Sequence, residues 1–151
     1  MGSSLLQSLV ITRLVVAISQ KLSTSHYIFT NELGLQFSKG NWRAADIAIY
    51  EKSQIDIKKV TNKYTKIPPK VVIEIDTKAD IEDIKDTFNY YNKKTDQLLE
   101  FGVERVVWIF TDSKKILIAS HKQDWTLINW SKEIQIFENF TINIAKLVEA
   151  A

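Results

Sequence analysis

The stretch Pro68-Pro-Lys-Val-Val-Ile-Glu-Ile-Asp76 decides the fold of this chain of 151 residues. Val71–Ile75 is apolar at almost every position, which is typical of a strand buried on both faces in the middle of a sheet. The two prolines cannot donate ladder hydrogen bonds, so they mark the end of the preceding loop. Val103–Phe110 is a second apolar strand of the same kind.

A helix is predicted between these two strands. Apolar residues recur at helical spacing up to Phe101, Asp80 or Asp83 can cap the start, and Gly102 is a natural stop. A strand, a helix and a strand in this order predict a parallel pair joined by a right-handed crossover.

The flanking segments complete a single α/β domain over residues 1–151, with a mixed β-sheet flanked by helices. A first helix is predicted from Ser3 or Ser4 to about Lys21. A closing helix is predicted up to Val148, capped by Asn139 or Thr141. The further predicted strands are His26–Thr30, Leu33–Ser38, Arg43–Tyr50, Lys114–Ala119, Trp125–Trp130 and Ile134–Phe137, with a short one possible at Ile55–Val60.

The composition excludes several kinds of site. The chain has no cysteine, which removes disulfides, thiolate zinc sites and cysteine nucleophiles. His26 and His121 are the only histidines, which argues against a multi-histidine metal site or a Ser-His-Asp triad. The apolar stretch Leu5–Ile18 is interrupted by Arg13 and by serines, so we expect no membrane span and a cytoplasmic protein.

Two acidic residues stand inside apolar, β-branched runs: Asp46 in Arg43-Ala-Ala-Asp-Ile-Ala-Ile-Tyr50, and Glu74 in Val71–Ile75. Burying an unpaired carboxylate costs several kcal/mol, so two such residues on neighbouring strands suggest carboxylates that bind a cation. Mg²⁺ and similar ions prefer oxygen ligands of this kind. The alternative is structural, with Asp46 paired with Arg43 and Glu74 paired with a lysine across the sheet.

Asp76 has two possible roles. Alternation along a strand places it on the same face as Glu74, where it could be a third metal ligand. It could equally be a residue that caps the start of the following helix.

An ordered set of short motifs resembles the PD-(D/E)XK nuclease superfamily, and within it the Uma-two family of proposed restriction endonucleases. The motifs lie within about residues 40 to 120 and are Ala45-Asp46, Glu74-Ile-Asp-Thr77, Lys94-x3-Leu98-x3-Gly102-Val103 and Val107-Trp108-Ile109. The resemblance implies a restriction-endonuclease-like fold and a Mg²⁺- or Mn²⁺-dependent DNA endonuclease. It implies Asp46, Glu74 and Lys94 as catalytic residues.

The chain departs from that pattern in three places. Ala45 replaces the family's proline, Leu98 replaces its tyrosine, and Asp76 stands where the superfamily has its lysine. The resemblance therefore implies that Lys94, from the following helix, supplies the missing ammonium group. We expect the aliphatic stem of Lys94 to be exposed, so that Lys94→Ala would leave folding intact. Lys93 and Lys78 are the alternatives to it, Gln97 lies one turn along the helix and could face the same site, and Glu32 could be the additional acid that some superfamily members carry.

DNA is the expected partner, although the net charge is only +2. Binding must then come from local patches, which the sequence offers at Lys58, Lys59, Lys63, Lys66 and Lys70 and at Lys93-Lys94. The alternative for such runs is a solvated surface.

A homodimer is also plausible, since superfamily nucleases often pair to cut two strands. Trp125, Ile128 and Trp130 could form its patch, or could simply be core residues. The functional alternative is a non-catalytic nucleic-acid-binding or protein-interaction module on the same fold. A glycosidase built on a carboxylate pair fits the small size and the apolar strands poorly.

Overall fold

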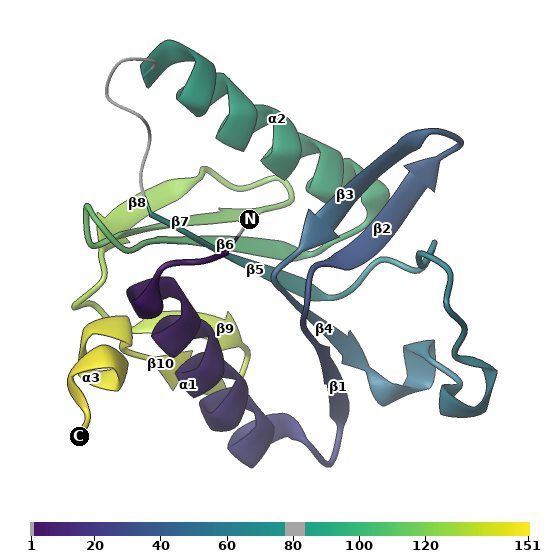
Figure 1. Cartoon of the computed structure of the whole chain (residues 1–151), viewed down its shortest axis with the longest axis horizontal. Helices are drawn as coiled ribbons and strands as arrows, with labels where there is room; N and C mark the ends of the chain where they lie inside the picture. Colours follow the sequence, from purple (N-terminus) through teal and green to yellow (C-terminus); the bar gives the residue numbers. More distant parts are fainter. Residues whose placement is uncertain (1, 78–83) are drawn as a thin grey trace.

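The computed structural model describes residues 2–77 and 84–151, and its main feature is a six-stranded mixed sheet (Figure 1). In spatial order the strands are β1 (His26–Phe29), β4 (Ile47–Glu51), β5 (Val71–Asp76), β6 (Arg105–Phe110), β7 (Lys115–Ser120) and β8 (Thr126–Asn129). β5 and β6 are parallel and every other neighbouring pair is antiparallel. The prediction of a mixed α/β sheet with a central parallel pair is therefore confirmed.

Helices cover both faces of this sheet because side chains alternate along its strands. Helix α1 (Leu5–Leu22) packs Val10, Leu14 and Ile18 on one face, against Ile73 and Val107 among others. Helix α2 (Ile84–Phe101) covers the other face, where Leu98 and Tyr91 meet Val72, Val106 and Trp108. This double burial explains why β5 and β6 are apolar at nearly every position.

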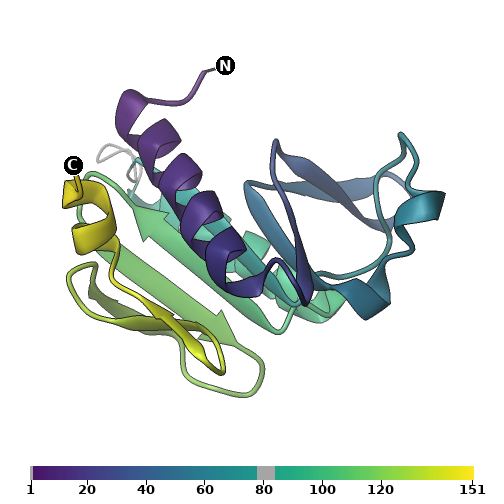
Figure 2. The same cartoon turned by 90° about the horizontal axis from the view of Figure 1, so that it is seen from below.

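Two hairpins stand outside the main sheet (Figure 2). One is formed by β2 (Leu33–Ser38) and β3 (Asn41–Ala45), beside the segment 52–67. The other is formed by β9 (Ile134–Phe137) and β10 (Phe140–Ile142), followed by α3 (Ile144–Glu149) beside α1.

The prediction of a single strand over Arg43–Tyr50 is wrong. The chain forms β3 up to Ala45, bends at Asp46, and begins β4 at Ile47. β3 pairs with β2, whereas β4 pairs with β1 and β5 in the main sheet. The bend therefore moves the chain from one sheet to the other and places Asp46 between them.

Two smaller expectations are also wrong. The possible strand at Ile55–Val60 is replaced by a single-turn 3₁₀ helix, η2 (Ile57–Lys59), which follows another, η1 (Lys52–Gln54). The last helix is capped by Asn143, whose side chain accepts a hydrogen bond from the Lys146 backbone amide; Thr141 belongs to β10 instead. The predicted caps of α2, Asp80 and Asp83, lie outside the described residues.

Helix α1 starts where the sequence predicts, with Ser4 and Gln7 forming a capping box. By length and composition it is apolar enough to cross a membrane. In this fold it is a core helix, because Val10, Leu14 and Ile18 are fully buried on the sheet. Arg13 ties it to α3 through the carbonyls of Leu147 and Val148, at 2.8 and 3.0 Å.

The tryptophans near the C-terminus belong to the core. Trp130 is buried in the cluster under α1, and Ile128 packs against the same cluster. Trp125 packs against the cluster under α2. Core packing, rather than an exposed dimer patch, therefore explains these residues.

Gly102 ends α2 at a φ of +121°, and a Cβ there would lie 3.0 Å from Pro68 Cγ. We expect Gly102→Ala to lower the free energy of unfolding by about 1–2 kcal/mol, measured by urea denaturation, because it adds backbone strain and a contact with a rigid ring. Gly40→Ala is the control, since Gly40 also has a positive φ but has open space around it. A loss no larger than that of the control would contradict the steric part of the argument.

Candidate active site

Asp46 and Glu74 meet at the carboxyl end of β5, and each binds the backbone beside the other. The Ile75 amide donates to Asp46 Oδ2 at 2.9 Å, and the Asp46 amide donates to Glu74 Oε2 at 3.3 Å. Glu74 is 4% exposed, beneath α2. These reciprocal bonds hold the bend at Asp46 against β5, so the two carboxylates have a fixed relation.

Lys94 reaches this pair from α2. Its Nζ lies 2.5 Å from Glu74 Oε1 and donates to the Ala44 carbonyl at 2.8 Å. The ammonium also lies 5.5 Å from the centre of the Trp108 ring. Lys94 is 6% exposed, so the expectation of an exposed stem is wrong. The ammonium joins α2 to β5 and to the end of β3.

Burial and charge act in opposite directions on this pair. Burial raises the pKa of Glu74 to about 8; the neighbouring Asp46 charge raises it and the Lys94 ammonium lowers it. Burial lowers the pKa of Lys94, but the attraction of Glu74 outweighs it, and the net pKa is raised. The lysine therefore stays charged, and the proton of Glu74 is the one that can be exchanged near neutral pH.

Asp76 is held at the side of this arrangement. It accepts a hydrogen bond from the Tyr91 hydroxyl at 3.1 Å and another from the Thr77 amide at 2.8 Å. Burial and the Asp76 charge raise the pKa of Tyr91, which keeps the hydroxyl a neutral donor. Among residues 2–77 and 84–151, no group of three or more acidic or histidine side chains is close enough together to hold a metal.

A cleft of about 510 Å³ opens over these residues. Asp46, Glu74, Asp76 and Lys94 line it, together with Glu32, which is exposed. The structure therefore brings three of the predicted site residues into direct contact and places Asp76 in the same cleft. Lys93 is exposed, and Lys78 lies outside the described residues.

Arg43, Tyr90 and Gln7 also line the cleft, and none of them was predicted as a catalytic or metal-binding residue. Arg43 donates to Gln97 Oε1 at 2.8 Å and lies 5.9 Å from the Tyr90 ring. The predicted alternative partner of Asp46 is thus bound to α2 instead. Gln7 of α1 donates to the Ile75 carbonyl at 3.3 Å, next to the two acids. The spacing of Gln7 from Ser4 indicates only a capping box, so the sequence gives no sign of the contact between Gln7 and Ile75.

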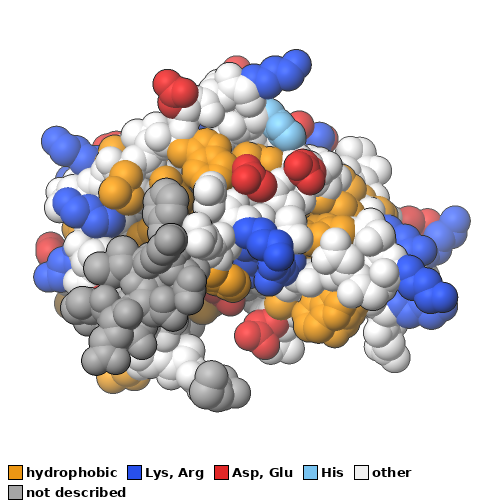
Figure 3. All heavy atoms as spheres, turned by 90° about the horizontal axis from the view of Figure 1, so that it is seen from above, with side chains coloured by type: hydrophobic (Ala, Val, Ile, Leu, Met, Phe, Trp, Pro, Cys, Tyr) orange, Lys and Arg blue, Asp and Glu red, His pale blue; other side chains and the backbone are white. Residues whose placement is uncertain are grey.

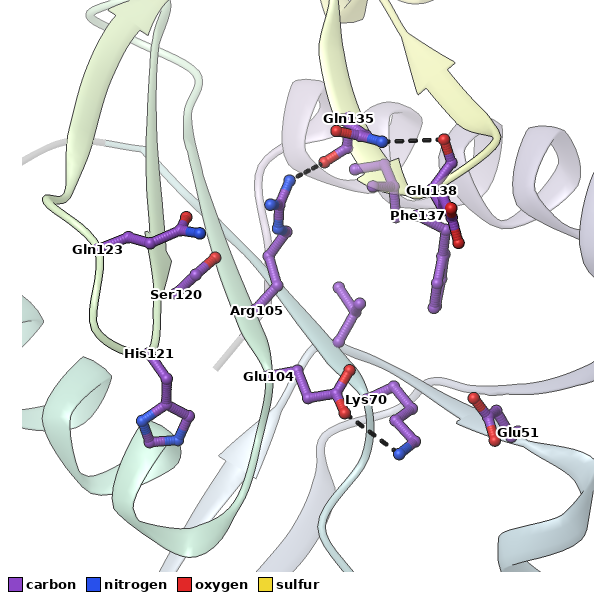
Figure 4. A pocket seen from close by; sticks show the side chains of 12 residues that line it. Glu51, Lys70, Glu104, Arg105, Ser120, His121, Gln123, Gln135, Phe137 and Glu138 are labelled. Carbon is purple, nitrogen blue, oxygen red and sulfur yellow. Dashed lines mark hydrogen bonds and ion pairs between the residues drawn. The ribbon is translucent and has the colours of Figure 1, made fainter.

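Another cavity, of about 520 Å³, lies at the opposite end of β5 and β6 (Figure 4). Three of its charged groups are already engaged: Lys70 pairs with Glu104 at 3.2 Å, and Arg105 donates to the Gln135 carbonyl at 2.5 Å. Lys70 is therefore separate from the other lysines of the 58–70 run. His121 lines this cavity, far along the strands from the acids.

Comparison with known proteins gives two matches. Residues 2–143 match the model of the Uma2 family, described as "putative restriction endonuclease". A crystal structure of a protein from Anabaena variabilis, titled a putative nuclease belonging to DUF820, superposes with a TM-score of 0.78 at 16% identity, covering 98% of this chain and 82% of that one. No curated protein matches the chain. The structural likeness establishes the fold, and the family match supports a nuclease function in general.

Proposed function

This chain belongs to the Uma2 family, and we propose that it is a metal-dependent endonuclease that hydrolyses phosphodiester bonds in DNA. One observation carries the proposal: the Glu74 carboxylate accepts from the Asp46 amide, the Asp46 carboxylate accepts from the Ile75 amide, and Lys94 Nζ lies 2.5 Å from Glu74 in an open cleft. An isolated structural ion pair would need neither the second acid nor the cleft.

The donor set fits Mg²⁺ or Mn²⁺. Glu74 Oε1 is buried, and the Lys94 ammonium, 2.5 Å away, is the partner that faces it within the described part of the chain. Mg²⁺ usually binds to one or two carboxylates and fills its other positions with water and substrate phosphate. Asp46 and Glu74 would hold the ion, whereas Asp76 forms no three-acid group with them among the described residues and is bound by Tyr91 and Thr77 instead. A bound ion would polarise the scissile phosphate and lower the pKa of an attacking water.

Lys94 supplies positive charge on the protein side. The Ala44 carbonyl fixes its ammonium, so the group is oriented before any substrate arrives. A fixed cation beside a phosphodiester stabilises the extra negative charge that develops during hydrolysis. Because the lysine is buried, little water screens this charge.

DNA is the proposed substrate, and the cytoplasm the proposed location. We propose that a homodimer is the assembly that cuts duplex DNA. Its two clefts would each act on one of the two DNA strands. The described lysines of the 58–66 run are exposed and available for phosphate contacts.

The test is cleavage by the purified protein of supercoiled plasmid and of a labelled duplex that carries a single-stranded extension. We expect nicking or cutting with Mg²⁺ or Mn²⁺ and none with EDTA, because the proposed chemistry depends on the ion. A heat-inactivated sample and the Asp46→Asn variant, prepared identically, control for contaminating nucleases. Binding of DNA without cleavage in either metal would favour the non-catalytic module instead.

A further inference from the structure

Two aromatic rings stand exposed together at the edge of the cleft. Trp42 of β3 is 48% exposed and Tyr64, in the segment 52–67, is 49% exposed. Their ring centres are 5.0 Å apart and their planes are inclined by 52°. Large aromatic side chains are usually more buried than this. An exposed pair of them therefore indicates a surface that binds a ligand.

The pair is held in place by the backbone around it. Tyr64 packs directly over Gly34, where a Cβ would lie only 2.4 Å from the ring. The next residue, Thr65, exchanges backbone hydrogen bonds with β2, donating to the Gly34 carbonyl at 3.0 Å and accepting from the Gln36 amide at 2.8 Å. The glycine therefore allows the ring to lie close to β2, and the strand-like pairing fixes its position.

A groove of about 580 Å³ continues from Tyr64. Its floor is apolar, and the side chains that form it include Phe29, Leu33, Ile55 and Val60. Lysines at its rim are Lys59, Lys63 and Lys66, and Asp56 is the one acid among its described lining residues. Figure 3 shows basic side chains gathered at the end of the molecule where Figure 1 places the segment 52–67, with hydrophobic side chains beside them.

The aromatic pair connects this groove to the candidate active site. Trp42 also lines the cleft that contains Asp46, Glu74 and Lys94. A polymer that lies on Trp42 and Tyr64 would therefore run from the lysine-rimmed groove directly to the two acids.

We propose that Trp42, Tyr64 and the lysine-rimmed groove bind unpaired nucleotides of a DNA strand whose scissile phosphate lies in the cleft. Bases stack on the two rings, and the phosphates pair with Lys59, Lys63 and Lys66. The inference that this strand is cut in the cleft rests on the proposed function. The inference that the surface binds a single strand does not depend on it.

The surface favours a single strand for physical reasons. The flat faces of bases are exposed only when they are unpaired, and stacking on an aromatic side chain contributes about 1–3 kcal/mol per base. An apolar floor with a cationic rim matches the flat faces of unpaired bases and the anionic phosphates that link them. The substrate class is thus DNA with an unpaired segment, such as a frayed end or a flap.

The test measures binding in EDTA, where cleavage plays no part. Fluorescence anisotropy of labelled oligo(dT) and of a blunt duplex is compared for the wild type, Trp42→Ala and Tyr64→Ala. We expect each variant to bind oligo(dT) about 10- to 100-fold more weakly, and the duplex within about twofold of the wild type. Tyr64→Phe keeps the ring and should bind normally. Leu127→Ala, which removes a 63% exposed side chain on β8, is the matched control.

Intrinsic fluorescence gives a second readout. Trp42 is the most exposed of the four tryptophans, so stacked bases should quench its emission, and this quenching should disappear in Trp42→Ala. Lys63→Ala and Lys66→Ala should each make the dependence of binding on salt less steep, whereas Lys132→Ala, on an exposed turn, should not.

Two results would overturn the proposal. One is equal oligo(dT) affinity for the wild type and a folded Trp42→Ala/Tyr64→Ala double variant, as judged by circular dichroism. The other is loss of self-association in that variant, by light scattering, with oligo(dT) binding unchanged; a second copy of the chain would then be the occupant. Failure to cleave DNA leaves these binding results standing, and failure to bind oligo(dT) leaves metal-dependent duplex cleavage standing.

Discussion

Glu74→Gln should reduce Mg²⁺-dependent DNA cleavage by at least ~1000-fold, which corresponds to about 4 kcal/mol of transition-state stabilisation. The substitution keeps the shape of the side chain and removes the negative charge that would hold the ion. Asp46→Asn should have a comparable effect, because its carboxylate faces the same cleft. Single-turnover rates on a labelled duplex, over a range of Mg²⁺ concentrations, are the measurement.

Asp96→Asn is the matched control, since Asp96 lies exposed on the same helix as Lys94. It should cleave like the wild type. Thermal unfolding of each variant separates loss of the site from loss of the fold. Cleavage by folded Glu74→Gln at the wild-type rate would mean that the Glu74 carboxylate holds no catalytic ion.

The central part of the fold could be predicted from the sequence because local signals and tertiary structure agree there. β5 and β6 are buried on both faces, so their apolar runs are unambiguous, and Gly102 ends α2 at a backbone angle that favours glycine. The two acids, Asp46 and Glu74, could be predicted as site residues because they interrupt apolar runs. Charge inside such a run is costly, and only a specific arrangement offsets it.

The break at Asp46 could not be predicted, because each half of Arg43–Tyr50 reads as a strand. What divides them is pairing with partners far away in the sequence: Leu33–Ser38 for one half, and His26–Phe29 with Val71–Ile73 for the other. The environment of Lys94 was hidden for a similar reason. A lysine on a helix is normally solvated, and only the packing of α2 over Glu74 shows that this one is buried.

The pairing of Trp42 with Tyr64 could not be predicted from the sequence either. Trp42 and Tyr64 are 22 residues apart by number and belong to segments of different kinds, so no spacing relates them. The lysine run was visible, but the structure divides it: Lys70 pairs with Glu104, while Lys59, Lys63 and Lys66 line the groove. The structure therefore divides this charge cluster between an ion pair and the proposed groove, which the sequence alone does not indicate.

Lys94→Met should slow single-turnover cleavage by about 100- to 1000-fold, which is the usual cost of removing one fixed electrostatic group from an active site. Lys93→Met, on the exposed neighbour, is the control and should have little effect. Because Lys94 is buried, the same substitution should also change stability, in a way that depends on pH.

The sign of that dependence follows from the Glu74 proton. The pKa of Glu74 is about 8 in the folded protein, against an ordinary value of 4.5. Between these values the native state keeps a proton that the unfolded chain has released, so the metal-free wild type should lose stability as pH rises from about 4.5 to about 8. Lys94 lowers the pKa of Glu74, so Lys94→Met should raise that pKa and extend the loss of stability to higher pH.

Urea denaturation in EDTA at pH values on either side of this window measures the effect. The variant should be close to the wild type at the acid end, where folded Glu74 is neutral. It should be less stable by up to about 3–5 kcal/mol at the alkaline end, where a buried carboxylate would lack its partner. Glu74→Gln/Lys94→Met replaces the whole pair by neutral groups, so it should recover most of this loss and show no decline across the window. A stability difference between Lys94→Met and the wild type that stays constant with pH would mean that Glu74 does not carry the exchangeable proton.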